Sequence, residues 1–149
     1  MGDHAEYVSV ADVQQACAEL GIRDWTHLDG PTVFIEEAEA IRAELGGETL
    51  EIHIEEFRRG LEVELEHGLR FADANVTNNH PLLTGKIVLA HLKEMLDYYL
   101  RLRVAELEGD MFKALVADDP AEVATAYSRV VDAREELARS EMQARTRHA

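Results

Sequence analysis

Four side chains in two neighbouring segments have the types and the spacing for metal chemistry. In Glu64-Leu65-Glu66-His67 and in His91-Leu92-Lys93-Glu94, a carboxylate and an imidazole lie three residues apart. Residues three apart share one face of an α-helix, so each segment would present both groups on one side. Two imidazoles and two carboxylates suit iron, manganese or zinc better than calcium or magnesium. The pattern predicts a divalent-metal site with Glu64, His67, His91 and Glu94 as its ligands.

The helical faces on which these residues fall support that prediction. A helix turns about 100° per residue, which puts Glu64 inside the apolar stripe that Phe57, Leu61 and Leu65 define. His91 lies in the same way at the centre of the apolar side of its own segment. A buried carboxylate without a partner costs several kcal/mol, and a bound cation would remove that cost. If the metal were iron, redox or oxygen chemistry would follow, because positions on the metal would stay open.

Two other interpretations use the same residues without metal. In the first, Glu64 bonds to His91 and His67 to Glu94, and this buried network fixes the packing of a non-catalytic interaction or structural protein. In the second, the polar pocket binds a small molecule. The sequence contains no Ser/His/Asp or Cys/His pattern and no phosphate-binding glycine loop, which disfavours hydrolases and kinases. Whether the protein is an enzyme stays open.

Composition limits the class of protein and its partners. The chain has 149 residues, of which 46% are hydrophobic, and this fits a single domain over residues 1–149. A net charge of −15 argues against nucleic acid and against an anionic membrane surface as partners. No apolar run approaches the roughly 20 residues of a membrane span. The first residues do not resemble a signal peptide, and the single Cys17 cannot form an internal disulfide, so we expect a cytoplasmic protein.

Apolar spacing and helix caps predict an all-α protein, a helical bundle of about five helices. The expected helices cover residues 10–20, 33–45, 50–67, 82–108 and about 120–138, and the third and fourth form a central hairpin around the four predicted ligands. The apolar stripe of the fourth continues past Gly109. Residues 1–8 are expected to form a flexible tail, and residues 139–149 to fray. The loop at 69–81 has the length at which loops are often functional.

Several stretches of this region resemble a known family. They are Gly60 to Gly68, Asn75 to Asn78, Thr84 to Ile87, Ala90 to Glu94 and Asp97 to Tyr99. Together they are similar to the DUF5661 family, small bacterial proteins of unknown function, over about residues 33–103. The resemblance implies that the hairpin is a unit, and it implies no activity. The family pattern has a proline at the position of Met95 or Leu96, and its absence here favours an unbroken fourth helix.

The spacing Glu64-x-x-His67 is also similar to that of ferritin-like di-iron proteins. Those proteins take a Glu-x-x-His motif from each of two helices and a Glu from each of two others. This chain has one such motif and one reversed motif, so it offers four ligands where a two-metal site needs six. Either one metal binds per chain, or two chains pool their ligands in a homo-oligomer, as encapsulated ferritins do.

Overall fold

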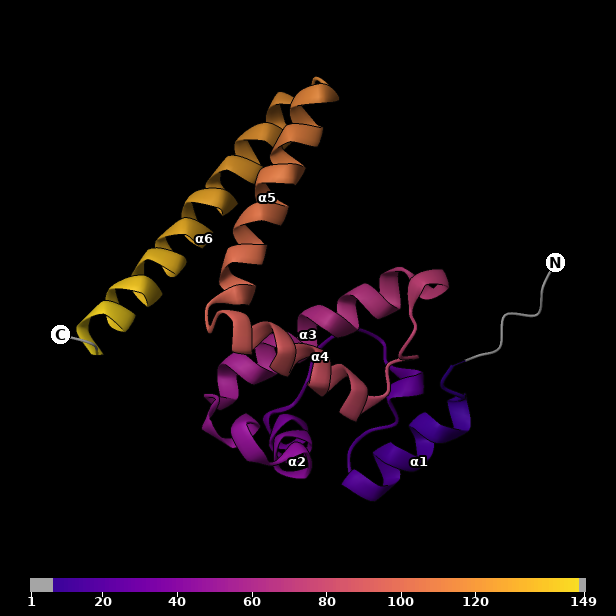
Figure 1. Cartoon of the computed structure of the whole chain (residues 1–149). Coiled ribbons are helices and arrows are strands. Elements are labelled where there is room, and N and C mark those ends of the chain that lie inside the picture. Colours follow the sequence, from indigo (N-terminus) through magenta and orange to yellow (C-terminus); the bar gives the residue numbers. More distant parts are fainter. Residues whose placement is uncertain (1–6, 148–149) are drawn as a thin grey trace. The chain divides into compact units, whose positions relative to one another are not determined.

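The computed structural model describes residues 7–147, and these residues form helices and connecting turns without any strand. The α-helices are α1 (Val10–Leu20), α2 (Ile35–Leu45), α3 (Ile54–Arg70), α4 (Pro81–Glu94), α5 (Tyr98–Val116) and α6 (Pro120–Arg147) (Figure 1). Short 3-10 helices lie at Trp25–His27, Gly47–Glu51 and Ala72–Ala74. The prediction of an all-α protein is confirmed. The helices number six within the described residues instead of about five, because the predicted fourth helix is broken.

The chain divides into two compact units, Met1–Glu94 and Met95–Ala149. The first unit holds α1 to α4, and the second holds α5 and α6. The prediction that residues 1–149 form a single domain stays a prediction. Residues 1–6 of the predicted tail and the last two residues lie outside the described part of the chain. None of the described helices is both long enough and apolar enough to span a membrane. A cytoplasmic location stays a prediction.

The first unit is built on a core to which all four of its α-helices contribute. Helix α1 begins where the sequence predicts, since the Ser9 hydroxyl accepts a bond from the Asp12 amide at 3.1 Å and the Asp12 carboxylate accepts the Ser9 amide. Its end at Gly21 uses a positive φ of 66°. The fully buried apolar side chains of the unit include Val13, Trp25, Val33, Ile41, Phe57, Leu61, Leu65 and Val88.

Gly85 lets α4 approach α2 and α3 closely. A Cβ atom at this position would lie 2.8 Å from a methyl group of Leu45 and 2.9 Å from one of Ile41. The ring of Phe57 on α3 would be 3.4 Å away. No ordinary side chain fits at such separations unless its neighbours move. The absence of a side chain at Gly85 therefore sets how closely α4 packs on the core.

A buried carboxylate fastens the segment between α1 and α2. The side chain of Glu37 accepts two bonds from the Arg23 guanidinium, at 2.9 and 2.7 Å, and one from the Phe34 amide at 2.9 Å. The Trp25 indole N–H donates to the same carboxylate at 3.4 Å. Burial acts to raise the pKa of Glu37, but the bonds and charge of Arg23 outweigh it, so the net pKa is lowered. Glu37 therefore stays ionised in the core.

The predicted fourth helix is interrupted at residues 95–97. Helix α4 ends at Glu94, the Tyr98 amide donates to the Met95 carbonyl at 3.1 Å, and α5 begins at Tyr98. The Asp97 carboxylate does not cap α5; it pairs with Arg101 instead, at 2.7 Å. The prediction of an unbroken helix over 82–108 was wrong. The chain turns here without a proline, and both Met95 and Leu96 are exposed in the turn.

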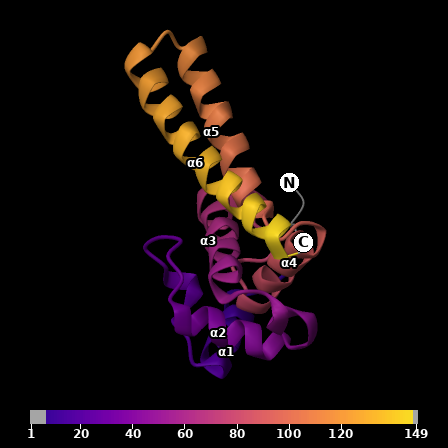
Figure 2. The same ribbon diagram turned by 90° about the vertical axis from the view of Figure 1, so that its left-hand side faces the viewer.

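The second unit is a hairpin of two helices that run side by side (Figures 1 and 2). Its inner residues recur at alternating steps of three and four, the pattern of a coiled-coil seam. They are Leu100, Val104, Leu107, Met111 and Ala114 on α5, and Val123, Ala126, Val130, Ala133 and Leu137 on α6. Helix α6 begins as predicted, with Asp119 accepting the Glu122 amide at 3.0 Å and Pro120 in the first position. It extends to Arg147, through most of the charged region where we expected fraying.

Candidate functional site

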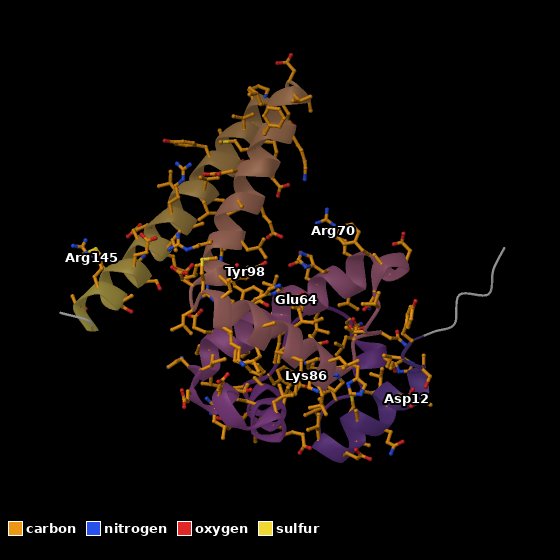
Figure 3. All side chains as sticks on the ribbon, in the orientation of Figure 1. Asp12, Glu64, Arg70, Lys86, Tyr98 and Arg145 are labelled. Carbon is orange, nitrogen blue, oxygen red and sulfur yellow. The ribbon has the colours of Figure 1, made fainter. Side chains whose placement is uncertain are left out.

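Three segments of the first unit meet around a hollow of about 220 Å³. Helix α3 contributes Glu64, which Figure 3 labels, and helix α4 contributes Thr84. The segment between the two helices closes the remaining side. The lining is half polar and half apolar: Glu64, His67, Asn75, Thr77 and Thr84 on one hand, and Gly68, Phe71, Ala74, Val76 and Ile87 on the other. Ligand pockets combine apolar side chains with a small number of polar groups, and this lining contains both kinds with a larger polar share.

Glu64 sits at this hollow in contact with α4. Its carboxylate oxygen lies 3.2 Å from Nδ1 of His91, and the two side chains are 16% and 32% exposed. Helical spacing therefore placed both residues correctly on the facing sides of α3 and α4. The pair is one of the two contacts expected for a metal-free network, although neither side chain is fully buried.

The four predicted ligands do not converge. His67 lines the hollow beside Glu64, whereas Glu94 is exposed at the last residue of α4. Among the described residues, no group of three or more His, Cys, Asp or Glu side chains could hold a metal ion. The prediction of a metal-binding protein with a two-His/two-Glu site was wrong. The ferritin-like interpretation of Glu64-x-x-His67 is withdrawn with it. The associated expectation of iron, manganese or zinc stays a prediction.

The register of the two helices explains why the ligands stay apart. Glu64 faces His91, while His67 shares the hollow with Thr84, so α3 and α4 run in opposite directions. His67 therefore lies toward one end of the α3/α4 helix pair, measured from the Glu64–His91 contact. Glu94 lies toward the opposite end. At about 1.5 Å per residue, these offsets separate His67 from Glu94 by roughly 9 Å along the axis. Convergence would need a register shifted by about one helical turn.

The segment between α3 and α4 is held in place by asparagine side chains. Asn75 donates to the Gly68 carbonyl at 3.3 Å and to the Asn79 side chain at 2.8 Å, and it accepts from the Thr77 hydroxyl at 3.1 Å. Asn78 and Asn79 have positive φ angles of 49° and 60°, which asparagine tolerates better than most residues. A Cβ on Gly68 would lie 2.3 Å from the Asn79 side-chain oxygen. This wall of the hollow is therefore fixed against α3.

A second, more open hollow adjoins the first. It measures about 720 Å³, and its lining is apolar except for Thr77 and the exposed Lys86, which Figure 3 labels. Val76, Thr77 and Ile87 line both hollows, so they form a shared wall. A ligand in the smaller hollow would thus lie beside an apolar surface on which a longer hydrocarbon tail could rest.

Sequence reasoning found Glu64 and His67 but missed the other polar residues of the hollow. Asn75, Thr77 and Thr84 read as turn formers and as a helix start, and nothing in their spacing indicates a shared pocket. One signal was present: these residues lie in the stretches that carry the family resemblance. Three of those stretches, 60–68, 75–78 and 84–87, are separated along the chain and contribute residues to this hollow.

The chain belongs to the DUF5661 family. The model of that family, described as "Protein of unknown function (DUF5661)", matches residues 13–108. The match confirms the resemblance and extends it toward the N-terminus through most of α1. It contains every residue of the 220 Å³ hollow and stops within α5, so that α6 lies beyond it. No curated protein and no solved structure matches the chain.

Proposed function

We propose that this DUF5661 protein binds a small cationic organic molecule, an amine with a compact apolar body, in the hollow between α3, α4 and residues 71–77. The observation that supports the proposal is a concave site that has a carboxylate in its wall and lies wholly within the family match. A volume of about 220 Å³ is below the 300–1,000 Å³ of pockets for drug-sized ligands. The ligand is accordingly small.

The chemistry of the lining supports the choice of a cation. Glu64 is the carboxylate of the hollow, and at 16% exposure its charge is screened less than a surface charge would be. The hydroxyl oxygens of Thr77 and Thr84 can accept further N–H bonds from an ammonium group. Phe71, Ala74, Val76 and Ile87 provide the apolar surface for the rest of the molecule.

Thermal unfolding with paired probes tests the proposal. A ligand that binds only the folded state stabilises it by about 2.7 kcal/mol at one hundred times its Kd. We expect benzylamine or butylamine to raise the melting temperature, and the neutral alcohols of the same shape to have little effect. The Glu64→Gln variant should lose the response to amines.

The matched control is Glu66→Gln, which removes an equal charge from an exposed position on the same helix. This variant should respond to amines as the unmodified protein does. Equal responses to amine and alcohol, or equal loss in both variants, would contradict the proposal. In the second case the amines would be responding to the overall acidity of the protein.

A further inference from the structure

One side of the α5/α6 hairpin shows how its two helices are aligned. Arg101 on α5 pairs with Glu141 on α6 at 2.7 Å, and Glu108 on α5 pairs with Arg134 on α6. From the first pair to the second, α5 advances seven residues while α6 goes back seven. The two helices are therefore antiparallel, and successive rungs on this side are one heptad apart.

The next pair of facing residues on this side of the hairpin is apolar. A further heptad step leads to Leu115 and Tyr127, which line the same groove near the turn between the helices. Both are exposed, and so are Phe112 and Val131, which lie within about 60° of Leu115 and Tyr127 around their helices. The ion pairs thus give way to large apolar side chains toward the turn. We call this surface the tip face, defined by Phe112, Leu115, Tyr127 and Val131.

The tip face contains a groove with acidic residues at one end. The groove measures about 350 Å³ and is lined by Met111, Leu115, Asp118, Asp119, Pro120, Val123, Ala124 and Tyr127. Asp119 caps α6, and Asp118 lies in the turn itself. The nearby cation Lys113 is already paired with Asp110 at 3.0 Å.

We propose that the tip face binds an amphipathic helix of a partner protein, with apolar side chains in the groove and Lys or Arg beside Asp118 and Asp119. Clustered exposed apolar residues of this size mark interaction sites. Helix-in-groove recognition uses anchors at steps of three and four, which match a groove between two helices. Charge selects the partner: a second copy would bring another −15 and the same two carboxylates, whereas a basic helix is attracted.

Fluorescence anisotropy with a designed peptide tests this on the full-length protein. The probe is a fluorescein-labelled helix of about 18 residues with Leu at positions i, i+3, i+4 and i+7 and Lys elsewhere. We expect saturable binding that weakens as salt rises, and much weaker binding of the counterpart with Glu in place of Lys. Leu115→Asp should weaken binding at least about tenfold, as loss of a central apolar anchor does.

The hairpin offers a closely matched control. Leu115 is 64% exposed and Met142, on α6, is 65% exposed and lies outside the groove, so Met142→Asp adds the same charge to a residue of equal exposure. This variant should bind the peptide as the unmodified protein does. Asp118→Asn should reduce the salt dependence, and asparagine suits the positive φ of 54° at that position.

Two results would overturn the proposal. Undiminished binding by the Leu115→Asp variant, which is more acidic than the unmodified protein, would show that the peptide responds to general acidity instead of to the tip face. A dimer in analytical ultracentrifugation that Leu115→Asp converts to a monomer would show that a second copy covers this surface. Both results are independent of amine binding by the first unit.

Discussion

At the scale of single residues, a carboxylate that lies in the core of the first unit is that of Glu37, not that of a predicted ligand. Its carboxylate accepts bonds from Arg23, Phe34 and Trp25 and is only 3% exposed. In the sequence it is one glutamate among many, in the first turn of a helix. Its role depends on the segment between α1 and α2, which carries Arg23 and Trp25 and folds back over Glu37. No local sequence pattern predicts that this segment folds back.

Replacing Glu37 with Gln should destabilise the protein and change how its stability depends on pH. Removing the charge weakens the pair with Arg23, and we expect a loss of about 2 kcal/mol at neutral pH, moderated because Arg23 is 37% exposed. The folded state lowers the pKa of Glu37 below its ordinary 4.5, so its contribution is complete above that pH. The contribution is lost as the pH falls through the lowered value.

Urea unfolding between pH 3 and 7, followed by the fluorescence of Trp25, measures this effect. The gap between the unmodified protein and Glu37→Gln should be widest near pH 7 and should narrow in acid. Glu36→Gln, an exposed neighbour on the same turn, serves as control and should leave the curve almost unchanged. A gap that is constant with pH would show that the charge of Glu37 contributes nothing.

At the scale of elements, the N-caps of α1 and α6 were predictable, and the interruption between α4 and α5 was not. Ser9 and Asp119 start their helices as expected, because each cap is a local bond between residues three apart. The turn at residues 95–97 contains neither glycine nor proline, so propensity favoured continuation. The pair of Asp97 with Arg101, inside the new helix, accompanies the break. Its sequence spacing fits a continuous helix equally well.

Two helical glycines should respond in opposite ways to substitution by alanine. At Gly85 the new methyl group would lie within 3 Å of Leu45 and Ile41, and we expect a loss of about 1–3 kcal/mol. At Gly109 nothing lies within 4 Å, so alanine should stabilise α5 by about 0.5–1 kcal/mol through its helix propensity. Trp25 fluorescence in urea reports the first change. Amide hydrogen exchange in α5 reports the second.

The two variants control each other, since both add one methyl group to a helix. Stabilisation by Gly85→Ala would mean that α4 does not pack as closely on α2 and α3 as the structure shows. Faster exchange of α5 amides in Gly109→Ala would contradict an open environment at that position. The Gly85 result bears only on the first unit, and the Gly109 result bears only on the second.

At the scale of the whole molecule, helix content and inward-facing sides were predictable, but the register between helices was not. The periodicity that put Glu64 and His91 on facing sides is a property of each helix by itself. Whether Glu64 faces His91 or Glu94 depends on where α4 begins and on the contact at Gly85. A shift of one turn decides between a four-ligand cluster and a pocket with one carboxylate. That difference is the reason the metal prediction failed although Glu64 and His91 lie on facing sides of their helices.

The two units also differ in how much of each the family match covers. The family match contains α2, α3 and α4 in full, most of α1 and part of α5, while α6 lies beyond it. The proposed amine pocket thus lies in the family-matched part, and every residue of the tip face lies outside the match.

Chemical-shift mapping by two-dimensional NMR tests amine binding in the 220 Å³ hollow most directly. Titration of the full-length protein with benzylamine should move the amide signals of His67, Asn75, Thr77 and Thr84 together, with a single Kd. The same titration of Glu64→Gln should leave them in place. Shifts confined to other regions, or equal shifts in both proteins, would show that the hollow is not the binding site.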